Sequence, residues 1–140
     1  MDDKEYRIPK EYRISDAFRR AFVTMRTIRD IGRSIMRRCS GALESDGKHQ
    51  VVCQLSALNK MLDHYEARYD TDKAVLEGVL IWRTILGAVI RGSDSPIPYL
   101  ERHKYKTRNG RIALVRNVKI SPADDLHILV SFTVETIKEA

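Results

Sequence analysis

Arginine residues recur along residues 15–39 at spacings that place most of them on one side of a helix. This segment holds seven arginines and two aspartates, a net charge of +5. At 100° per residue, four of the arginines fall within about 40° of one another and a fifth lies beside them. At 1.5 Å per residue they span about 27 Å, enough to follow several phosphates of a nucleic-acid backbone. This predicted arginine ridge consists of Arg19, Arg26, Arg29, Arg33 and Arg37.

The choice of arginine over lysine favours phosphate as the ligand of this ridge. A guanidinium group is a planar fork that can donate two hydrogen bonds to one phosphate. A face that serves solubility alone normally mixes both signs of charge, whereas Asp30 is the one acid within the ridge. We therefore predict phosphate binding. Two alternatives stay open: an ordinary solvated face, and a docking face for an acidic protein.

A second basic segment lies near the C-terminus. Residues 102–119 carry seven lysines and arginines and no acid. One tyrosine sits among these cations, a combination typical of sites that stack against single-stranded bases or contact a groove. The alternative is a polar hairpin whose cations protect an edge strand from aggregation. The residues expected to bind nucleic acid here are Lys104, Tyr105, Lys106, Arg108 and Arg111.

No motif in the sequence predicts catalysis or a cofactor. The chain has no glycine-rich phosphate loop, no His-Glu-x-x-His pair and no nucleophile elbow. His49, Cys53 and Cys39 match no standard zinc spacing, so we expect no metal. Asp63, His64 and Glu66 could form a nuclease-like acid–base site, but exposed polar residues on a helix explain them better. We predict a protein without enzymatic activity, metal or cofactor.

Three helices are expected to position the basic residues. Apolar residues from Ile14 to Cys39, with Phe18, Phe22 and Met25 among them, recur every three or four positions and predict a helix over residues 15–39. Steps of four and three from Val51 to Tyr69 predict a second helix that forms a hairpin with the first.

The third predicted helix covers residues 72–91. Acids at 70 and 72 begin it, and Gly92 ends it. Because this helix is apolar nearly all round, it is either central or part of an oligomer interface, and we favour the interface. Gly78 and Gly87 lower helix propensity and would permit close approach of another element.

The remaining segments are an N-terminal arm, a linker and a basic hairpin with a C-terminal element. Residues 1–14 repeat Glu-Tyr-Arg-Ile and predict an extended arm that packs on its own domain or grips a neighbour or a nucleic-acid strand. Residues 93–101 are a linker, and a hairpin of His103–Thr107 with residues 111–120 turns at Asn109-Gly110, with Ile112, Leu114, Val118 and Ile120 on one face.

The last segment is ambiguous. Ser121-Pro122 and the acids that follow favour a helix, whereas the alternation from Leu126 to Val134 favours a strand. We prefer the helix. The predicted fold is therefore mainly α: a bundle of three to four helices, with core residues 15–92 and the basic hairpin and C-terminal helix of residues 102–140 packed on the same domain. The alternative is an α+β fold with a C-terminal three-stranded meander.

Composition is consistent with one globular domain. The 140 residues are 43% apolar and 31% charged, with a net charge of +6. The longest apolar run, residues 74–90, is too short to span a membrane. The acidic start without an apolar segment and two cysteines predicted to be free thiols favour the cytoplasm or a viral particle over secretion.

These features together predict a non-catalytic nucleic-acid-binding protein. We expect a homo-oligomer, joined through residues 72–91 and the arm, that serves as an accessory or structural part of a nucleoprotein or virion assembly. RNA and DNA are not distinguished. The alternative is a scaffold subunit whose basic surface docks an acidic protein.

Overall fold

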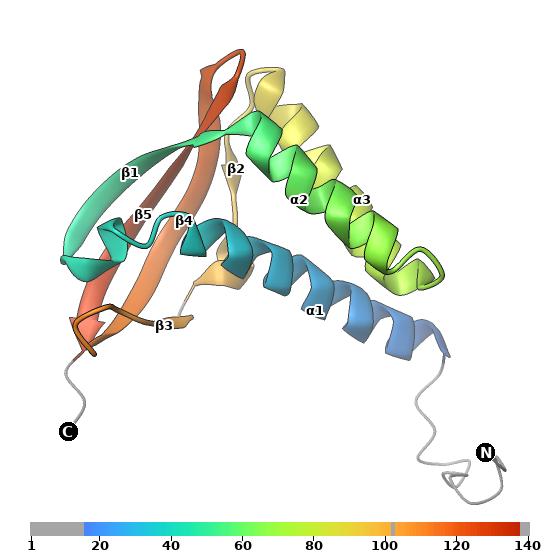
Figure 1. Cartoon of the computed structure of the whole chain (residues 1–140), viewed down its shortest axis with the longest axis horizontal. Coiled ribbons are helices and arrows are strands. Elements are labelled where there is room, and N and C mark those ends of the chain that lie inside the picture. Colours follow the sequence, from blue (N-terminus) through green and yellow to red (C-terminus); the bar gives the residue numbers. More distant parts are fainter. Residues whose placement is uncertain (1–15, 102, 138–140) are drawn as a thin grey trace, which may run out of the picture.

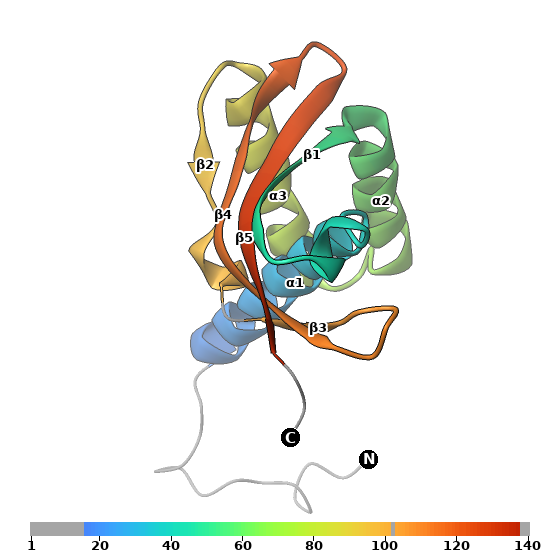
Figure 2. The same cartoon turned by 90° about the vertical axis from the view of Figure 1, so that its left-hand side faces the viewer.

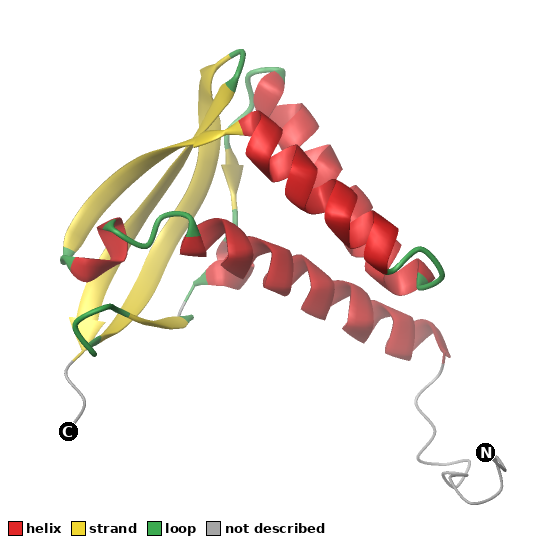
Figure 3. Cartoon of the chain, in the orientation of Figure 1, coloured by secondary structure: helices red, strands yellow, loops and turns green. Residues whose placement is uncertain are grey.

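The protein combines three α-helices with a five-stranded antiparallel sheet (Figure 1, Figure 3). The computed structural model describes residues 16–101 and 103–137. The elements in chain order are α1 (Asp16–Arg37), the 3-10 helix η3 (Ala42–Glu44), β1 (Gly47–Gln54), α2 (Leu55–Arg68), α3 (Lys73–Ile90), β2 (Ser95–Pro96), the 3-10 helix η4 (Pro98–Leu100), β3 (Lys104–Lys106), β4 (Ile112–Asp124) and β5 (His127–Ile137). The expected mainly α fold is therefore wrong, and the protein is α+β.

The sheet has the order β1-β5-β4-β2, with the short strand β3 also paired to β4. Strands β4 and β5 form a long hairpin, and β1 pairs with the free edge of β5 over all eight of its residues. The three helices pack against one face of this sheet (Figure 1, Figure 2). In the described part of the chain, the other face carries no helix.

The C-terminal segment is a strand, not the helix we preferred. Ile128, Val130, Phe132 and Val134 alternate along β5 and are each at most 2% exposed, because they face the helices. The Ser-Pro-Ala-Asp signal marks the end of β4 and a turn. There the Asp124 carboxylate accepts a hydrogen bond from the Leu126 backbone N–H at 2.8 Å. An aspartate caps such a turn as well as it caps a helix. The alternation of apolar residues from Leu126 to Val134 was therefore the more informative signal for this segment.

The second predicted helix begins four residues later than expected. The spacing predicts a helix from Val51 onward, but Gly47–Gln54 form β1, and α2 starts at Leu55. Along β1, His49, Val51 and Cys53 point toward the core while the residues between them are exposed. Consecutive β-branched residues at 51 and 52 fit a strand better than the first turn of a helix. This strand separates α1 from α2, so the two do not form the predicted hairpin.

Helix α1 instead packs along α3, and the contact is close. Trp82 Nε1 donates a hydrogen bond to the Ile28 carbonyl at 2.8 Å, and Thr24 Oγ1 donates one to the Ala74 carbonyl at 3.0 Å. A Cβ atom at Gly78 would lie 2.7 Å from Thr27 Cγ2. The absence of a side chain at Gly78 therefore permits the close approach that the sequence suggested.

The bounds of α1 and α3 agree with the predicted helices to within two residues. Asp72 caps α3, since its carboxylate accepts hydrogen bonds from Ala74 N and Val75 N. Much of the apolar character of α3 is explained within one chain, because Val79, Trp82 and other side chains are buried against α1, α2 and the sheet. Leu80, Ile81 and Ile90 stay exposed. The oligomer interface through this helix stays a prediction.

Residues 93–101, predicted as a linker, are packed on the core. They contain β2 and η4, and Ile97 and Leu100 are at most 1% exposed. Leu100 fills the space left by Gly32 on α1. The predicted arm, residues 1–14, lies outside the described residues. No helix of the described chain has the length and apolar character needed to cross a bilayer.

The hairpin around Asn109-Gly110 is confirmed as β3 and β4, with Gly110 in the left-handed region at φ +81. One detail differs. We expected Ile112, Leu114, Val118 and Ile120 on one face, but a bulge at Asn117, with φ 55, shifts the register between Arg116 and Lys119. The bulge reverses the alternation, so that Ala113 and Val115 share the core face with Val118 and Ile120.

Candidate nucleic-acid interface

Helix α1 presents most of the arginine ridge to solvent because its opposite side is buried. Ile28, Ile31 and Ile35 are at most 3% exposed. The ridge members Arg19, Arg26, Arg29 and Arg37 are exposed, and Arg33 is partly buried. Among the described residues, no carboxylate forms an ion pair with any member of the ridge. The positive charge of the ridge is therefore not neutralised by those residues.

Arg33 joins the ridge to the basic hairpin. Its guanidinium carbon lies 5.9 Å from the centroid of the Tyr105 ring on β3, a cation–π arrangement. These residues are 72 positions apart in the sequence, so the sequence could not show the contact. The two basic segments, predicted separately, meet at this point.

Tyr105 is buried, which differs from its expected role. Only 6% of the residue is exposed, and it belongs to the hydrophobic core. Burial raises the pKa of Tyr105 to about 12, against the opposing effect of Arg33 and Arg37. The ring packs β3 against α1 and offers no free face to a base. The expectation that Tyr105 stacks on nucleic acid does not fit this position.

Lys104 and Lys106 flank Tyr105 and point to the other side of β3. The strand alternates exposed, buried, exposed, and its register pairs Lys104 with Leu114 and Lys106 with Ile112. In the sheet β3 is an edge strand, paired with β4 alone. The hairpin lysines and the end of the arginine ridge therefore lie on two sides of one edge strand, and their positive potentials add in this region.

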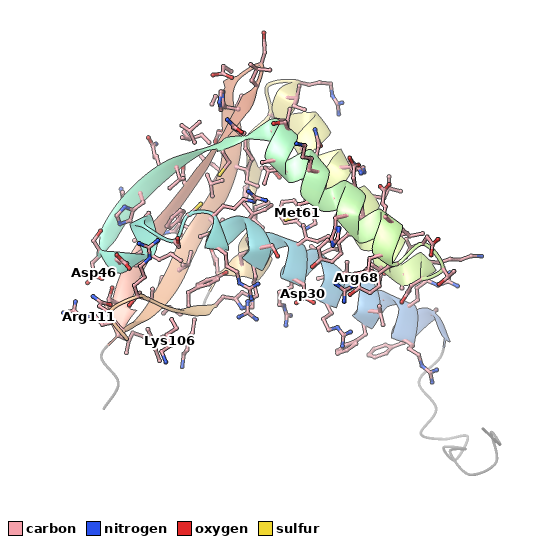
Figure 4. The ribbon with its side chains drawn as sticks, in the orientation of Figure 1. Asp30, Asp46, Met61, Arg68, Lys106 and Arg111 are labelled. Atoms are coloured by element: carbon pink, nitrogen blue, oxygen red, sulfur yellow. The ribbon has the colours of Figure 1, made fainter. Side chains whose placement is uncertain are left out.

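The tip of the hairpin carries charge that nearby acids partly offset. Arg108 Nε lies 3.9 Å from Glu44 Oε1, and the Arg108 N–H donates to the same oxygen at 3.3 Å. Hydrogen bonds from Thr136 lower the pKa of Asp46, and the nearby Arg111 adds to this effect. Figure 4 shows Asp46, Arg111 and Lys106 at the same end of the molecule. Arg108 and Arg111 are therefore less available to phosphate than Lys104 and Lys106.

Three apolar residues that the helical periodicity of α1 places on its buried stripe are exposed. Phe18, Phe22 and Met25 are 60%, 61% and 46% exposed. The helical wheel contained the signal, because Phe22 and Ile31 are nine residues apart and so lie about 180° from each other. The apolar residues of α1 form two faces, of which the second lies beside Arg26 and Arg29.

A hollow beside the start of the ridge adds two further cations. This hollow has a volume of about 530 Å³ and lies between α1 and the start of α3. Arg19, Arg20, Lys73 and the capping residue Asp72 line it. Arg20 and Lys73 were not predicted, because the packing of α1 along α3 could not be inferred from spacing.

The described residues show no cluster of side chains suited to hold a metal ion. They contain no group of three or more histidine, cysteine or acidic residues able to hold a metal ion. Asp63 and Glu66 each accept a 2.7 Å hydrogen bond from Arg83, so these carboxylates join α2 to α3. Comparison with family models, with curated proteins and with solved structures found no match for this chain.

Proposed function

We propose that this protein binds nucleic acid through its backbone phosphates, using the arginine ridge of α1 and the lysines of β3. One observation carries the proposal: Arg33 packs on Tyr105, so that two cationic segments far apart in the sequence adjoin each other. The ridge arginines have no ion pair among the described residues. When such arginines bind phosphates, they release the counterions condensed on the nucleic acid, and this release favours binding.

The exposed apolar residues beside the ridge favour a single strand over a duplex. Phe22 and Met25 project from the helix face that also bears Arg26 and Arg29. A duplex hides the faces of its bases, whereas a single strand can stack them on an aromatic side chain while arginines hold its phosphates. In this arrangement Phe22, not Tyr105, is the stacking residue.

A binding assay with charge-reversal variants tests the proposal. Fluorescence anisotropy would compare labelled single-stranded and duplex oligonucleotides of equal length at two salt concentrations. The variant Arg26→Glu/Arg29→Glu is expected to bind the single strand at least tenfold more weakly than the wild type, since both side chains are exposed and bind phosphate.

The matched control is Lys48→Glu/Lys60→Glu, which changes the net charge equally at exposed positions on β1 and α2. This control is expected to lose much less affinity. Absence of wild-type binding at low salt would refute the proposal. Equal losses in the two variants would show that net charge, and not the α1 surface, attracts the nucleic acid.

A further inference from the structure

Strand β1 forms one border of the sheet, and its outer edge has no strand beside it. The order β1-β5-β4-β2 places β1 at this border, opposite β2 (Figure 2). Among the described residues, β1 pairs with β5 alone. The unpaired edge extends over the eight residues of the strand, Gly47–Gln54.

The opposite border of the sheet is protected against further pairing, whereas β1 is not. Natural sheets protect their edges with very short strands, proline or charged side chains. At the opposite border β2 has two residues, one of them Pro96, and β3 has three, of which Lys104 and Lys106 are exposed. Strand β1 is longer than both, has no proline, and carries Lys48 as its one lysine, arginine or acidic residue. Its edge is therefore open to another strand.

The hydrogen bonds of the sheet show which side of β1 the backbone of Gly47 faces. The Val115 N–H donates to the His103 carbonyl at 3.4 Å, so the backbone groups of Val115 point toward β3 and away from β5. Val115 lies opposite Val134, and Val134 lies opposite Gly47. Directly opposite residues of antiparallel strands point their backbone groups either toward or away from each other. Those of Val134 and Gly47 therefore point toward each other.

Alternation along β1 then places the backbone groups of Gln50 and Val52 at the outer edge. Outside the β1–β5 ladder, no backbone hydrogen bond of the described residues involves Gln50 or Val52. Val51 faces the core but is only partly buried, and Val52 is 59% exposed. A hollow of about 190 Å³ beside the last residues of this edge leaves space next to the strand, and it is lined by Arg38, Val52, Cys53, Gln54 and Ala57.

We propose that the outer edge of β1 pairs antiparallel with β1 of a second copy of this chain, about a two-fold axis at Val51. Backbone hydrogen bonds form only when the outward residues of one strand lie opposite those of the other. Gly47 has a positive φ of 111, so the extended part of the strand is residues 48–54. Val51 is the centre of that segment, and a two-fold axis there uses its whole length.

The sequence of β1 is compatible with itself in this register. Gln50 lies opposite Val52 of the second copy, and such a pair exchanges both of its backbone hydrogen bonds. Lys48 lies opposite Gln54 of the second copy, so no like charges meet across the pair. Val51 lies opposite its own copy, a β-branched pair that suits a sheet. The interface is isologous, and the sheet continues through both copies. The inference does not depend on nucleic-acid binding.

A proline at the outer edge tests the pairing by its effect on mass. Because α3 can also join copies, sedimentation would use chains that carry Leu80→Glu/Ile81→Glu, which are expected to form a reversible dimer of about twice 16.2 kDa. Adding Val52→Pro removes an outward N–H without taking a bond from the β1–β5 ladder. It is expected to weaken the dimer by roughly tenfold or more, since each copy loses a donor.

The matched control is Val52→Thr, which keeps the N–H and the β-branched shape and is expected to dimerise as before. Circular dichroism checks folding, and Gln50→Pro replaces Val52→Pro if that variant does not fold. A parent chain that stays monomeric throughout the concentration series would overturn the proposal. So would a folded Val52→Pro variant that dimerises as tightly as the Val52→Thr control.

Hydrogen exchange of the wild-type amides identifies the paired edge without any substitution. The amides of Gln50 and Val52 are expected to exchange rapidly in dilute protein and to become protected as the concentration rises. Those of Val51 and Cys53 point toward β5 and should be protected throughout. Exchange at Gln50 and Val52 that stays fast in concentrated protein would contradict the proposal. Protection that is the same at every concentration would show that a segment of the same chain, such as residues 1–14, occupies the edge, and would overturn it as well.

A mixed sample of carbon-13-labelled and unlabelled chains tests the register. An isotope-filtered NMR experiment is expected to show a contact between the Hα atoms of His49 in one copy and Cys53 in the other, because these residues oppose each other in a pair that is not hydrogen-bonded. A concentrated sample in which Gln50 and Val52 are protected but this contact is missing would exclude the two-fold axis at Val51.

Discussion

The guanidinium carbon of Arg33 lies 5.9 Å from the centre of the Tyr105 ring. This contact places the edge strand β3 against the first helix. The hydroxyl oxygen of Tyr105 and the Nε of Arg33 are both buried without a hydrogen-bond partner among the described residues. The contact therefore depends on packing and on the attraction between a cation and a ring, not on a hydrogen bond to the hydroxyl.

Removing the hydroxyl of Tyr105 is expected to leave the protein as stable or slightly more stable. An unpartnered buried hydroxyl costs free energy, so Tyr105→Phe should change the free energy of unfolding by about 0 to +1 kcal/mol. Tyr105→Ala, which also removes the ring, should lower it by about 3 kcal/mol or more. Urea denaturation at neutral pH measures both values. A large loss in Tyr105→Phe would show that the hydroxyl has a partner.

The same tyrosine predicts a component of stability that is lost in alkali. Its pKa in the folded protein is about 12, above the ordinary value of 10. Between these values the unfolded chain releases the Tyr105 proton while the folded chain keeps it, so stability falls as the pH rises from about 10 to about 12. Tyr105→Phe lacks this titrating group, so the stability of the wild type should fall increasingly below that of Tyr105→Phe as the pH rises through this range. A wild-type curve parallel to that of Tyr105→Phe would contradict the raised pKa.

The close approach of α1 and α3 predicts opposite effects at two glycines. Gly78→Ala would place a methyl group 2.7 Å from Thr27 Cγ2 and 2.8 Å from its Cβ, so the helices must shift, and stability should fall by about 1 to 3 kcal/mol. Gly87→Ala is the control, because its Cβ would meet only the flexible end of Arg91 at 3.4 Å. That variant should gain up to about 1 kcal/mol from helix propensity. Similar effects at both sites would refute the packing.

The oligomer predicted through α3 can be tested at its exposed apolar residues. Leu80 and Ile81 are 61% and 39% exposed. If they join two copies, sedimentation analysis should show a wild-type oligomer, and Leu80→Glu/Ile81→Glu should lower its mass while circular dichroism stays unchanged. A wild type that is monomeric at every concentration would remove this interface.

The exposed ring of Phe22 predicts selective loss of single-strand binding. Stacking of one base contributes about 1 to 3 kcal/mol, so Phe22→Ala should weaken binding of a single strand by roughly 5-fold to 150-fold and leave duplex binding unchanged. Because Phe22 is 61% exposed, the melting temperature should barely move. Equal losses for single strand and duplex would exclude stacking by this residue.

The sequence predicted the helical elements better than it predicted the sheet. Helical periodicity and the Asp72 cap are local signals, and they located α1 and α3. The helix start expected after Ser121 failed because Asp124 caps a turn with the same chemistry. The strand β1 was missed because its partner, β5, lies about 80 residues further along the chain, as in the pairing of Gln50 with Ser131.

The candidate interface was predicted in its charges but not in its geometry. The arginine spacing on α1 depends on helical periodicity alone, and the structure keeps most of the ridge exposed. The burial of Tyr105 depends on the packing of β3 against α1, which no spacing reveals. The position of Cys53 on β1 likewise required the fold, since the sequence alone placed this residue on a helix.

The most direct test of the α1 surface is the salt dependence of single-strand binding. The logarithm of the affinity should fall linearly with the logarithm of salt concentration, with a slope of about −0.7 for each phosphate engaged. Arg26→Gln/Arg29→Gln removes two cations without adding repulsion and should make the slope shallower by about 1.4, whereas Lys48→Gln/Lys60→Gln should leave it unchanged. A slope that is the same in the wild type and in the arginine variant would contradict the account.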